Sequence, residues 1–294
     1  MNNSSIPTIT VIIPAYNAQG YLDLLLTSLI DQEYPKGFIE IILINNNSTD
    51  NTKCIAQGYP ITCLDETNSQ SSYVTRNTGI KHAKNEIIAF IDADCLPDPN
   101  WLREGVAELA EADADIAGGR VEFYYSERKT AAEFYDSMTN MQVENYICER
   151  GVAPTANLFV RASLFDKVGL FPEDAISGGD IRWTKKATSM GYKLVYAPRA
   201  VVQHPSRTFR ELLAKHIRVG TGLISIRRDE WGWPKKLIEA MKLILPPNPF
   251  AINTLIVNRG TPEMYKKFWD IWVVAYLCKI AHCAGIASSF INSE

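Results

Sequence analysis

The sequence lacks several features that would place the protein in a special class. Its six cysteines are scattered and form no C-x-x-C pair or other metal-binding spacing, which favours reduced thiols over a disulfide framework. The first eight residues are polar and lack a basic stretch followed by an apolar one, so we expect no signal peptide and a cytoplasmic protein. Internal repeats and low-complexity tracts are absent from the sequence, which argues against solenoid and fibrous architectures.

An overall excess of positive charge is also absent. The 30 Lys and Arg residues are outnumbered by 33 Asp and Glu residues, for a net charge of −3, and this balance argues against a dedicated nucleic-acid-binding protein. The charge is nevertheless uneven, because residues 199–242 contain ten Lys/Arg and four Asp/Glu, a local balance of +6 against −9 for the rest. Such asymmetry often marks a surface that meets phosphate or anionic lipid.

The chain does contain an alternation of apolar runs and helical patterns. With 294 residues, 46% of them hydrophobic, it can form one large α/β domain with a sizeable core. We expect strands at residues 8–14, 39–44, 60–64 and 86–91, and helices at residues 20–30, 48–57 and 71–83. This order predicts a mostly parallel sheet with crossover helices, in which ligands bind at the carboxyl ends of the strands.

The second half of the chain is less regular. We expect strands within 115–124 and at 156–160, 193–197 and 200–203, and helices at 129–147, 161–168, 180–190, 207–227 and about 268–291. The last helix is long enough to span a bilayer, but interior Lys279 and His282 are costly there. Two alternatives stay open for it: contact with an anionic membrane surface, or packing as core.

Two acidic residues follow the strand expected at 86–91. If the segment stays extended, Asp92 and Asp94 share a face, and their carboxylates repel each other unless a cation lies between them. A hard divalent ion such as Mg²⁺ is bound by one or two carboxylates plus phosphate oxygens. The alternative is a helix start, because acids favour first turns and Pro97 and Pro99 follow.

Six ordered motifs between about residues 8 and 210 carry a family resemblance. They read VIIPAYN, NNNSTDNT, RNTGI, IDADCLPDPNWL, TANLFVRASLFDKVGLFPE and GGDIRWTKKATSMGYKLVYAPRAVVQHPSR, and together they resemble the family 2 glycosyltransferases of the GT-A fold. The resemblance implies an α/β fold of GT-A type, with a Rossmann-like, mostly parallel central sheet flanked by helices and a helical C-terminal tail. It implies a glycosyltransferase domain at 1–230, with a nucleotide-sugar half at about 1–120 and an acceptor half at about 121–230, and a helical extension at 231–294.

The resemblance also implies a site for a nucleotide-diphosphate sugar at the strand ends. The residues expected to bind this donor are Pro14, Ala15, Tyr16, Asn17, Asn45, Asn47, Arg76, Asn77, Asp92, Ala93 and Asp94. Family members commonly have an Asp that reads uracil where this chain has Asn45, so UDP is the first expectation and GDP or dTDP stay open. Mg²⁺ or Mn²⁺ is expected at Asp94, Asp92 and His204, where it would stabilise the departing diphosphate.

A second set of residues is expected around the acceptor. By resemblance, Asp180 is the carboxylate that deprotonates the acceptor hydroxyl in a single in-line displacement, which inverts the anomeric centre. Asn157, Gly179 and Trp183 are expected to bind the acceptor. A helix N-cap is the alternative role for Asp180.

These patterns predict an inverting, metal-dependent glycosyltransferase of polysaccharide biosynthesis. Its acceptor would be a hydroxyl of a glycan or of a lipid-linked molecule, and the enzyme would be peripheral on the inner face of the membrane. A sugar nucleotidyltransferase is one alternative, but it would have a Gly-rich, basic loop after the first strand, where this chain has PAYNAQG. A catalytically silent nucleotide-sugar-binding module is another, and the presence of Asp94 and Asp180 counts against it.

Overall fold

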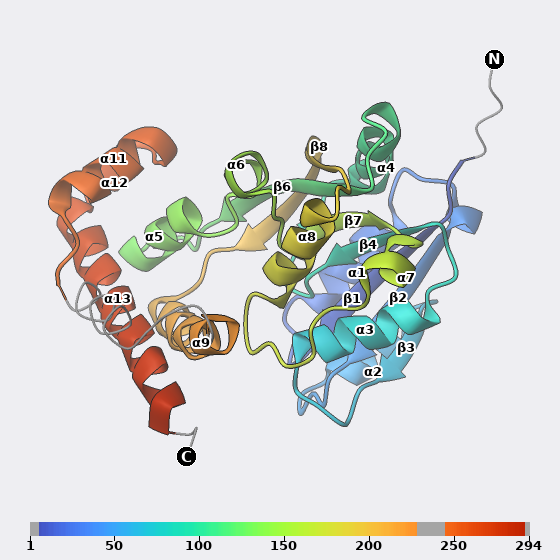
Figure 1. The fold of residues 1–294 in the computed structure, drawn as a ribbon, viewed down its shortest axis with the longest axis horizontal. Coiled ribbons are helices and arrows are strands. Elements are labelled where there is room, and N and C mark those ends of the chain that lie inside the picture. The colour runs from blue at the N-terminus through green and yellow to red at the C-terminus, as the bar shows by residue number, and fades with distance from the viewer. Residues whose placement is uncertain (1–5, 228–244, 292–294) are drawn as a thin grey trace. The chain divides into compact units, whose positions relative to one another are not determined.

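The computed structural model describes residues 6–227 and 245–291, which belong to two compact units of the chain (Figure 1). The sheet unit comprises Met1–Glu122, Gln142–Glu173 and Gly179–His204. The helical unit comprises Phe123–Met141, Asp174–Gly178 and Pro205–Glu294. The domain boundary expected at residue 230 lies outside the described residues.

One eight-stranded sheet forms the centre of the sheet unit. Its strands are β1 Ile9–Ala15, β2 Ile39–Asn45, β3 Thr62–Asp65, β4 Ile87–Ile91, β5 Leu96–Pro97, β6 Ile116–Tyr124, β7 Asn157–Arg161 and β8 Leu194–Pro205. Their spatial order is β3-β2-β1-β4-β7-β6-β8-β5. The pairs from β3 to β4 are parallel, and β7 runs antiparallel to β4 and β6. The expected α/β fold, with helices flanking this sheet, is confirmed.

Helices make up most of the remaining described residues. In the sheet unit they are α1 Leu22–Ile30, the 3-10 helix η1 Lys36–Phe38, α2 Thr52–Gln57, α3 Ser72–His82, α4 Trp101–Glu111, α6 Val143–Arg150, α7 Leu164–Val168 and α8 Gly179–Ser189. In the helical unit they are α5 Ala131–Thr139, α9 Phe209–Arg227, α11 Pro249–Arg259, α12 Pro262–Tyr265 and α13 Phe268–Ile291.

The β-branched residues of β1 explain why this strand lies at the centre of the sheet. Ile9, Val11 and Ile13 alternate along the strand, share one face of the sheet and are fully buried in the main hydrophobic cluster. Helix α3 packs against β1 and β2 on the other face. A Cβ at Gly79 of α3 would lie 2.7 Å from Ile12 Cγ2, so glycine at this position allows the helix to approach the sheet closely.

The register of the parallel strands brings their carboxyl ends together. Ala15 at the end of β1 pairs with Asn45 at the end of β2, and Asn45 pairs with Asp65 at the end of β3. On its other side, β1 pairs with β4, which ends at Ile91. Strand order reverses at β1, and such a reversal leaves a crevice for ligands outside the carboxyl ends of the strands.

The structure differs from the sequence-based expectations in several elements. The helix expected at 129–147 is two helices, α5 and α6, because Asn140 is extended and Met141 has a φ of 49°. The strands expected at 193–197 and 200–203 are one strand, β8, which continues through Pro198. Several elements have no counterpart among the expected ones: η1, β5, α4, α11 and α12. The apolar residues of α4 nevertheless recur at helical spacing.

Helix α13 packs against three other helices of the helical unit. Ile271, Val274 and Cys278 are buried where α13 packs against α5, α9 and α11. The backbones of α13 and α9 are in direct contact at two glycines. A Cβ at Gly220 of α9 would lie 2.2 Å from a carbonyl oxygen of α13, and a Cβ at Gly285 of α13 would lie 2.0 Å from a carbonyl oxygen of α9. One side of the final helix therefore packs within the helical unit, which is one of the two alternatives, whereas its contact with a membrane stays a prediction.

A buried carboxylate links α5 to the beginning of α9 within the helical unit. Asp136 is fully buried and accepts hydrogen bonds from the backbone N of Arg207 at 3.0 Å and from Arg207 Nη1 at 3.3 Å. Lys215 Nζ lies 3.8 Å from Asp136 Oδ1. Burial lowers the pKa of Lys215 to about 7, and repulsion from Arg207 acts in the same direction while Asp136 opposes it. The carboxylate of Asp136 is thus the shared countercharge of two largely buried cations, Arg207 and Lys215.

We expect Asp136→Asn to lower the free energy of unfolding by about 3 kcal/mol, because it leaves Arg207 and Lys215 buried without a countercharge. The matched control is Glu263→Gln, which breaks the exposed ion pair between Glu263 and Lys129 in the same unit and should cost less than about 1 kcal/mol. Urea unfolding of both variants measures the difference. Equal losses would contradict a stabilising role for the buried cluster.

The low pKa of Lys215 also predicts a pH dependence. Its pKa in the folded protein, about 7, lies below the ordinary value of 10.5, so the unfolded chain binds more protons between these limits and stability should rise with pH. Relative to Lys215→Met, the wild-type protein should gain about 1 kcal/mol per pH unit between pH 7 and 9. Unfolding free energies of both proteins across this window provide the test, and a constant difference would contradict it.

Candidate active site

Two loops interlock at the carboxyl ends of β1 and β2. Asn17 and Asn47 have positive φ angles of 49° and 56°, which Asn tolerates better than most residues. Asn17 bonds across to the second loop, since its backbone N donates to Ser48 Oγ at 3.0 Å and its Oδ1 accepts from the backbone N of Thr49 at 2.8 Å. These two asparagines therefore shape the edge of the sheet where the donor is expected.

The side chain of Asn45 is occupied at both ends. Its Nδ2 donates to Asp65 Oδ1 at 2.9 Å, and its Oδ1 accepts from the backbone N of Ser48 at 3.3 Å. Asp65 also pairs with Lys53 at 2.5 Å, and the bond from Asn45, followed by that from Lys53, lowers the pKa of the Asp65 carboxyl. A carboxylate is thus present at this edge, one strand away from the position where the family resemblance places it.

Asp65 was not predicted as a site residue, because β3 has only four residues and its hydrophobic pattern is weak. The register between Asn45 and Asp65 could have been found only from the pairing of β2 with β3. The nearby end of β1 is as expected: Pro14 and Ala15 close the strand, and the side chain of Tyr16 is 52% exposed. An exposed ring beside these loops is free to stack on a planar group.

Arg76 and Asn77 of α3 point to different partners. Arg76 is buried, and its Nη2 lies 2.5 Å from Asp92 Oδ1. Asn77 is fully buried; its amide donates to the backbone O of Phe171 at 2.9 Å and accepts from the backbone N of the same residue at 3.0 Å. Arg76 therefore touches the acidic segment directly, whereas the described bonds of Asn77 hold the chain before α8.

The two carboxylates after β4 have separate partners. The strand ends at Ile91, and a tight turn follows in which the backbone N of Cys95 donates to the carbonyl oxygen of Asp92 at 3.1 Å. Asp92 pairs with Arg76, while Asp94 lies beside His204, with 3.6 Å between Asp94 Oδ2 and His204 Nε2. The intervening Ala93 is largely buried. The charge of Asp92 is therefore compensated within the protein.

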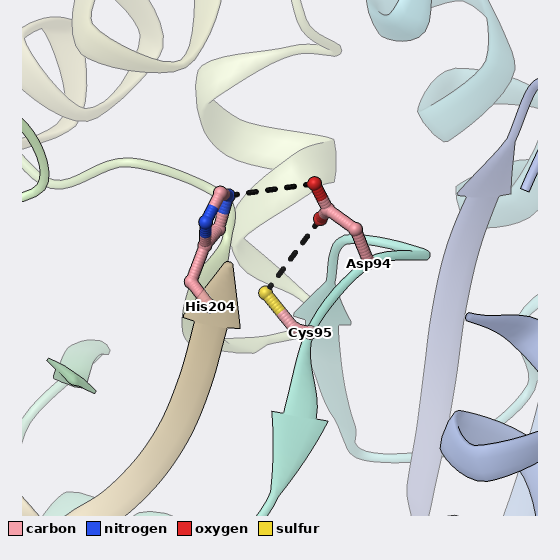
Figure 2. Close-up of side chains that lie close together, drawn as sticks. All are labelled: Asp94, Cys95 and His204. Atoms are coloured by element: carbon pink, nitrogen blue, oxygen red, sulfur yellow. Dashed lines mark hydrogen bonds and ion pairs between the residues drawn. The ribbon is translucent and has the colours of Figure 1, made fainter. Parts of the chain in front are cut away.

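Asp94, Cys95 and His204 form a compact group that could hold a metal ion, as Figure 2 shows. Their donor atoms all lie within 4.8 Å of one another, and His204 is buried while the Asp94 side chain is 36% exposed. A carboxylate oxygen and an imidazole nitrogen suit a divalent ion such as Mn²⁺. Cys95 was not anticipated from sequence, and only its place next to Asp94 could have indicated it.

Asp180 lies at the beginning of α8 with both carboxylate oxygens oriented. Oδ2 accepts from the backbone N of Thr155 at 3.1 Å, and Oδ1 accepts from the backbone N of Ile181 at 2.9 Å. The hydroxyl of Tyr73 lies 3.5 Å from Oδ1, and a Cβ at Gly179 would lie 2.9 Å from the Tyr73 ring. Tyr73, which the sequence reasoning missed, therefore packs directly against the glycine that precedes Asp180.

Three consecutive residues, 155–157, lead into β7 and connect the parts of the site. Thr155 holds Asp180, and the carbonyl oxygen of Ala156 accepts from Cys95 Sγ at 3.9 Å. Asn157 is fully buried, where its Oδ1 accepts from Trp101 Nε1 at 2.8 Å and its amide donates to two backbone carbonyls. The carboxylate of Asp180 and the turn that carries Asp94 are therefore anchored to adjacent residues.

Trp183 lies one helical turn after Asp180 and is buried. Its Nε1 donates to the carbonyl oxygen of Gly169 at 2.6 Å, and its ring stacks on Phe165 with centroids 4.8 Å apart. The described contacts of Trp183 and of Asn157 are thus with protein groups. Their expected part in binding the acceptor stays a prediction.

Comparison with known proteins identifies the family. The family model described as Glycosyl transferase family 2 matches residues 10–164, which is more than half of the chain. The chain belongs to glycosyl transferase family 2. The matched region contains the strand-end loops and the turn with Asp92 and Asp94, so the family assignment and the geometry concern the same part of this glycosyltransferase.

Two curated relatives agree with the assignment. Glycosyltransferase AglE of Haloferax volcanii is 40% identical over 300 residues, which cover 99% of both chains. Poly(ribitol-phosphate) beta-N-acetylglucosaminyltransferase TarS of Staphylococcus aureus is 28% identical over 184 residues, which are 60% of this chain and 32% of TarS. The protein is therefore a glycosyltransferase, and its similarity to AglE extends over nearly the whole chain.

Solved structures confirm the GT-A fold of this glycosyltransferase. The mannosyltransferase PcManGT from Pyrobaculum calidifontis, in complex with GDP-Man and Mn²⁺, has a TM-score of 0.62 at 21% identity and matches 99% of this chain and 89% of its own. S. aureus TarS 1-349 in complex with UDP-GlcNAc has a TM-score of 0.55 at 20% identity and matches 97% and 92%.

Proposed function

We propose that this enzyme transfers a sugar from a nucleoside-diphosphate sugar to an acceptor hydroxyl, with inversion and with the help of a divalent metal ion. The observation that carries the proposal is the separation of the two carboxylates after β4. Arg76 compensates Asp92, and Asp94 is left beside the buried His204 at the mouth of the sheet. A diphosphate with its metal ion would meet one carboxylate and one imidazole there.

Asp94 and His204 are the residues that would hold the ion. Their donor set fits Mg²⁺ or Mn²⁺, and a structural neighbour, PcManGT, carries Mn²⁺ together with GDP-Man. The ion would neutralise the charge that develops on the departing diphosphate. Asp92, held by Arg76, is suited to accept a hydrogen bond from the ribose or from water on the ion.

Asp180 would act as the general base. Its Oδ2 and Oδ1 are each fixed by one backbone N–H, from Thr155 and Ile181. The acceptor oxygen attacks the anomeric carbon as its proton passes to Asp180, and the bond from that carbon to the diphosphate oxygen breaks. A single displacement of this kind inverts the anomeric centre. Gly179, which has no side chain, lets the ring of Tyr73 pack beside the carboxylate.

The donor nucleotide would lie across the interlocked loops after β1 and β2. Tyr16 can stack on the base, and the carboxylate of Asp65, which Asn45 holds in place, has further acceptor capacity at the edge. UDP is our first choice and GDP or dTDP are alternatives, since the structural neighbours include complexes with both UDP-GlcNAc and GDP-Man. The acceptor would be a glycan or a lipid-linked molecule.

Substitution of Asp94 tests the metal requirement. Asp94→Asn should abolish transfer and weaken the binding of a nucleoside diphosphate in Mn²⁺, because a neutral amide oxygen attracts a divalent cation less than a carboxylate does. EDTA should abolish transfer by the wild-type enzyme. The control is Asp113→Asn, which neutralises an exposed carboxylate between α4 and β6. Full activity of Asp94→Asn, or of the wild type in EDTA, would refute the assignment.

Substitution of Asp180 tests the base. Asp180→Asn keeps the shape of the side chain but removes the proton acceptor, so turnover should fall by roughly 10²–10⁴-fold while the affinity for the donor nucleotide stays close to that of the wild type. Turnover, nucleotide titration and thermal unfolding separate chemistry from folding. Unchanged turnover would show that Asp180 is not the base and serves only as a helix cap. A product with retained anomeric configuration would exclude the single displacement.

A further inference from the structure

Helix α13 has an apolar side that no described part of the protein covers. Trp269, Val273 and Ile280 follow one another at helical spacing and are 66%, 47% and 42% exposed. Half-buried Tyr276 and exposed Ala284 continue the same side of the helix. We call these five residues the outer stripe. None of its five residues is charged, although the stripe faces away from the buried side of the helix. Exposed Asp270 and half-buried Lys279 are its charged neighbours on α13.

The opposite side of α13 is apolar as well. Its buried residues include Ile271, Ala275 and Cys278, which belong to the core of the helical unit. An ordinary surface helix is polar on its outer side, and a helix that is apolar all round lies in a core or in lipid. By length and composition, residues 268–288 could cross a membrane, yet only 33% of their most apolar window is buried. A core helix would be covered far more completely.

A membrane-spanning arrangement does not suit the partner of α13. Helix α9 contacts α13 at backbone distance through Gly220 and Gly285, so the two helices would enter hydrocarbon together. Exposed Arg210, Glu211 and Arg218 of α9 would then lose their water, which is costly for charged side chains. A position in the plane of the membrane surface immerses the outer stripe alone and keeps these charges hydrated.

The composition around the stripe favours lipid over a second copy of the chain. Trp269 on the stripe and exposed Tyr265 just before α13 are amphipathic aromatic residues of the kind enriched at membrane interfaces. Pairing of two copies through α13 would bring their positively charged α9 helices closer together. The same cations attract anionic headgroups, and α9 lies in the segment at 199–242 whose local balance is +6.

We propose that the outer stripe of α13 lies in the headgroup region of an anionic lipid bilayer, with the helix parallel to the membrane plane. The apolar side chains enter the boundary between headgroups and acyl chains, and the cations of α9 add an attraction that salt screens. This inference concerns the helical unit alone and does not depend on the proposed metal, base or donor.

Vesicle flotation with the full chain tests the proposal. The wild type should float with vesicles of phosphatidylcholine and phosphatidylglycerol, bind pure phosphatidylcholine more weakly, and bind the mixed vesicles less as salt rises. Val273→Glu and Ile280→Glu each place a carboxylate in the stripe and should weaken binding at least roughly tenfold. Both positions are exposed, so thermal unfolding should be unchanged.

Leu24→Glu is the matched control. Leu24 is 67% exposed on α1 of the sheet unit, so this variant adds the same charge at an exposed apolar site outside the stripe and should bind like the wild type. Failure of the wild type to float at low salt, or normal flotation of Val273→Glu, would overturn the proposal. A wild-type dimer in light scattering that Val273→Glu makes monomeric, with vesicle binding unchanged, would also overturn it. Transfer to a soluble acceptor should survive in these variants, which separates this test from that of the reaction.

Discussion

The ion pair between Arg76 and Asp92 sets the electrostatics of the strand ends. Two carboxylates so close in sequence would repel each other at the half-buried carboxyl end of a strand. Because Arg76 Nη2 lies 2.5 Å from Asp92, that charge is compensated from α3. Asp94 therefore keeps a half-buried carboxylate beside His204. Three elements supply this arrangement: α3 carries Arg76, the turn after β4 carries both carboxylates, and the end of β8 carries His204.

The sheet unit supplies the rigid frame for this arrangement. Parallel pairing aligns Ala15, Asn45 and Asp65 at one edge. The two residues just before the antiparallel β7 bond to the turn of Asp94 and to the carboxylate of Asp180. The turn that carries Asp94 and the carboxylate of Asp180 are thus each held by hydrogen bonds that involve backbone groups. Such preorganisation is what a displacement reaction requires of its base and its charge-stabilising groups.

Sequence patterns predicted the strands and α-helices of residues 8–91 because β-branched runs and helical spacing are local signals. They also indicated Asp94, His204 and Asp180 through the family resemblance. They could not reveal Cys95 or Asp65, whose proximity to the site follows from the turn after β4 and from the register of β3. Nor could they reveal the break between α5 and α6, since the positive φ of Met141 is a tertiary outcome that its residue type does not favour.

The most direct test of this account is the position of a bound metal ion. Crystals of the full chain grown with Mn²⁺ and a nucleoside diphosphate should give an anomalous peak about 2 Å from a carboxylate oxygen of Asp94 and within bonding distance of His204 Nε2, while Arg76 still pairs with Asp92. A peak centred on Asp92 instead, with Arg76 displaced, would contradict the division of charge on which the account depends.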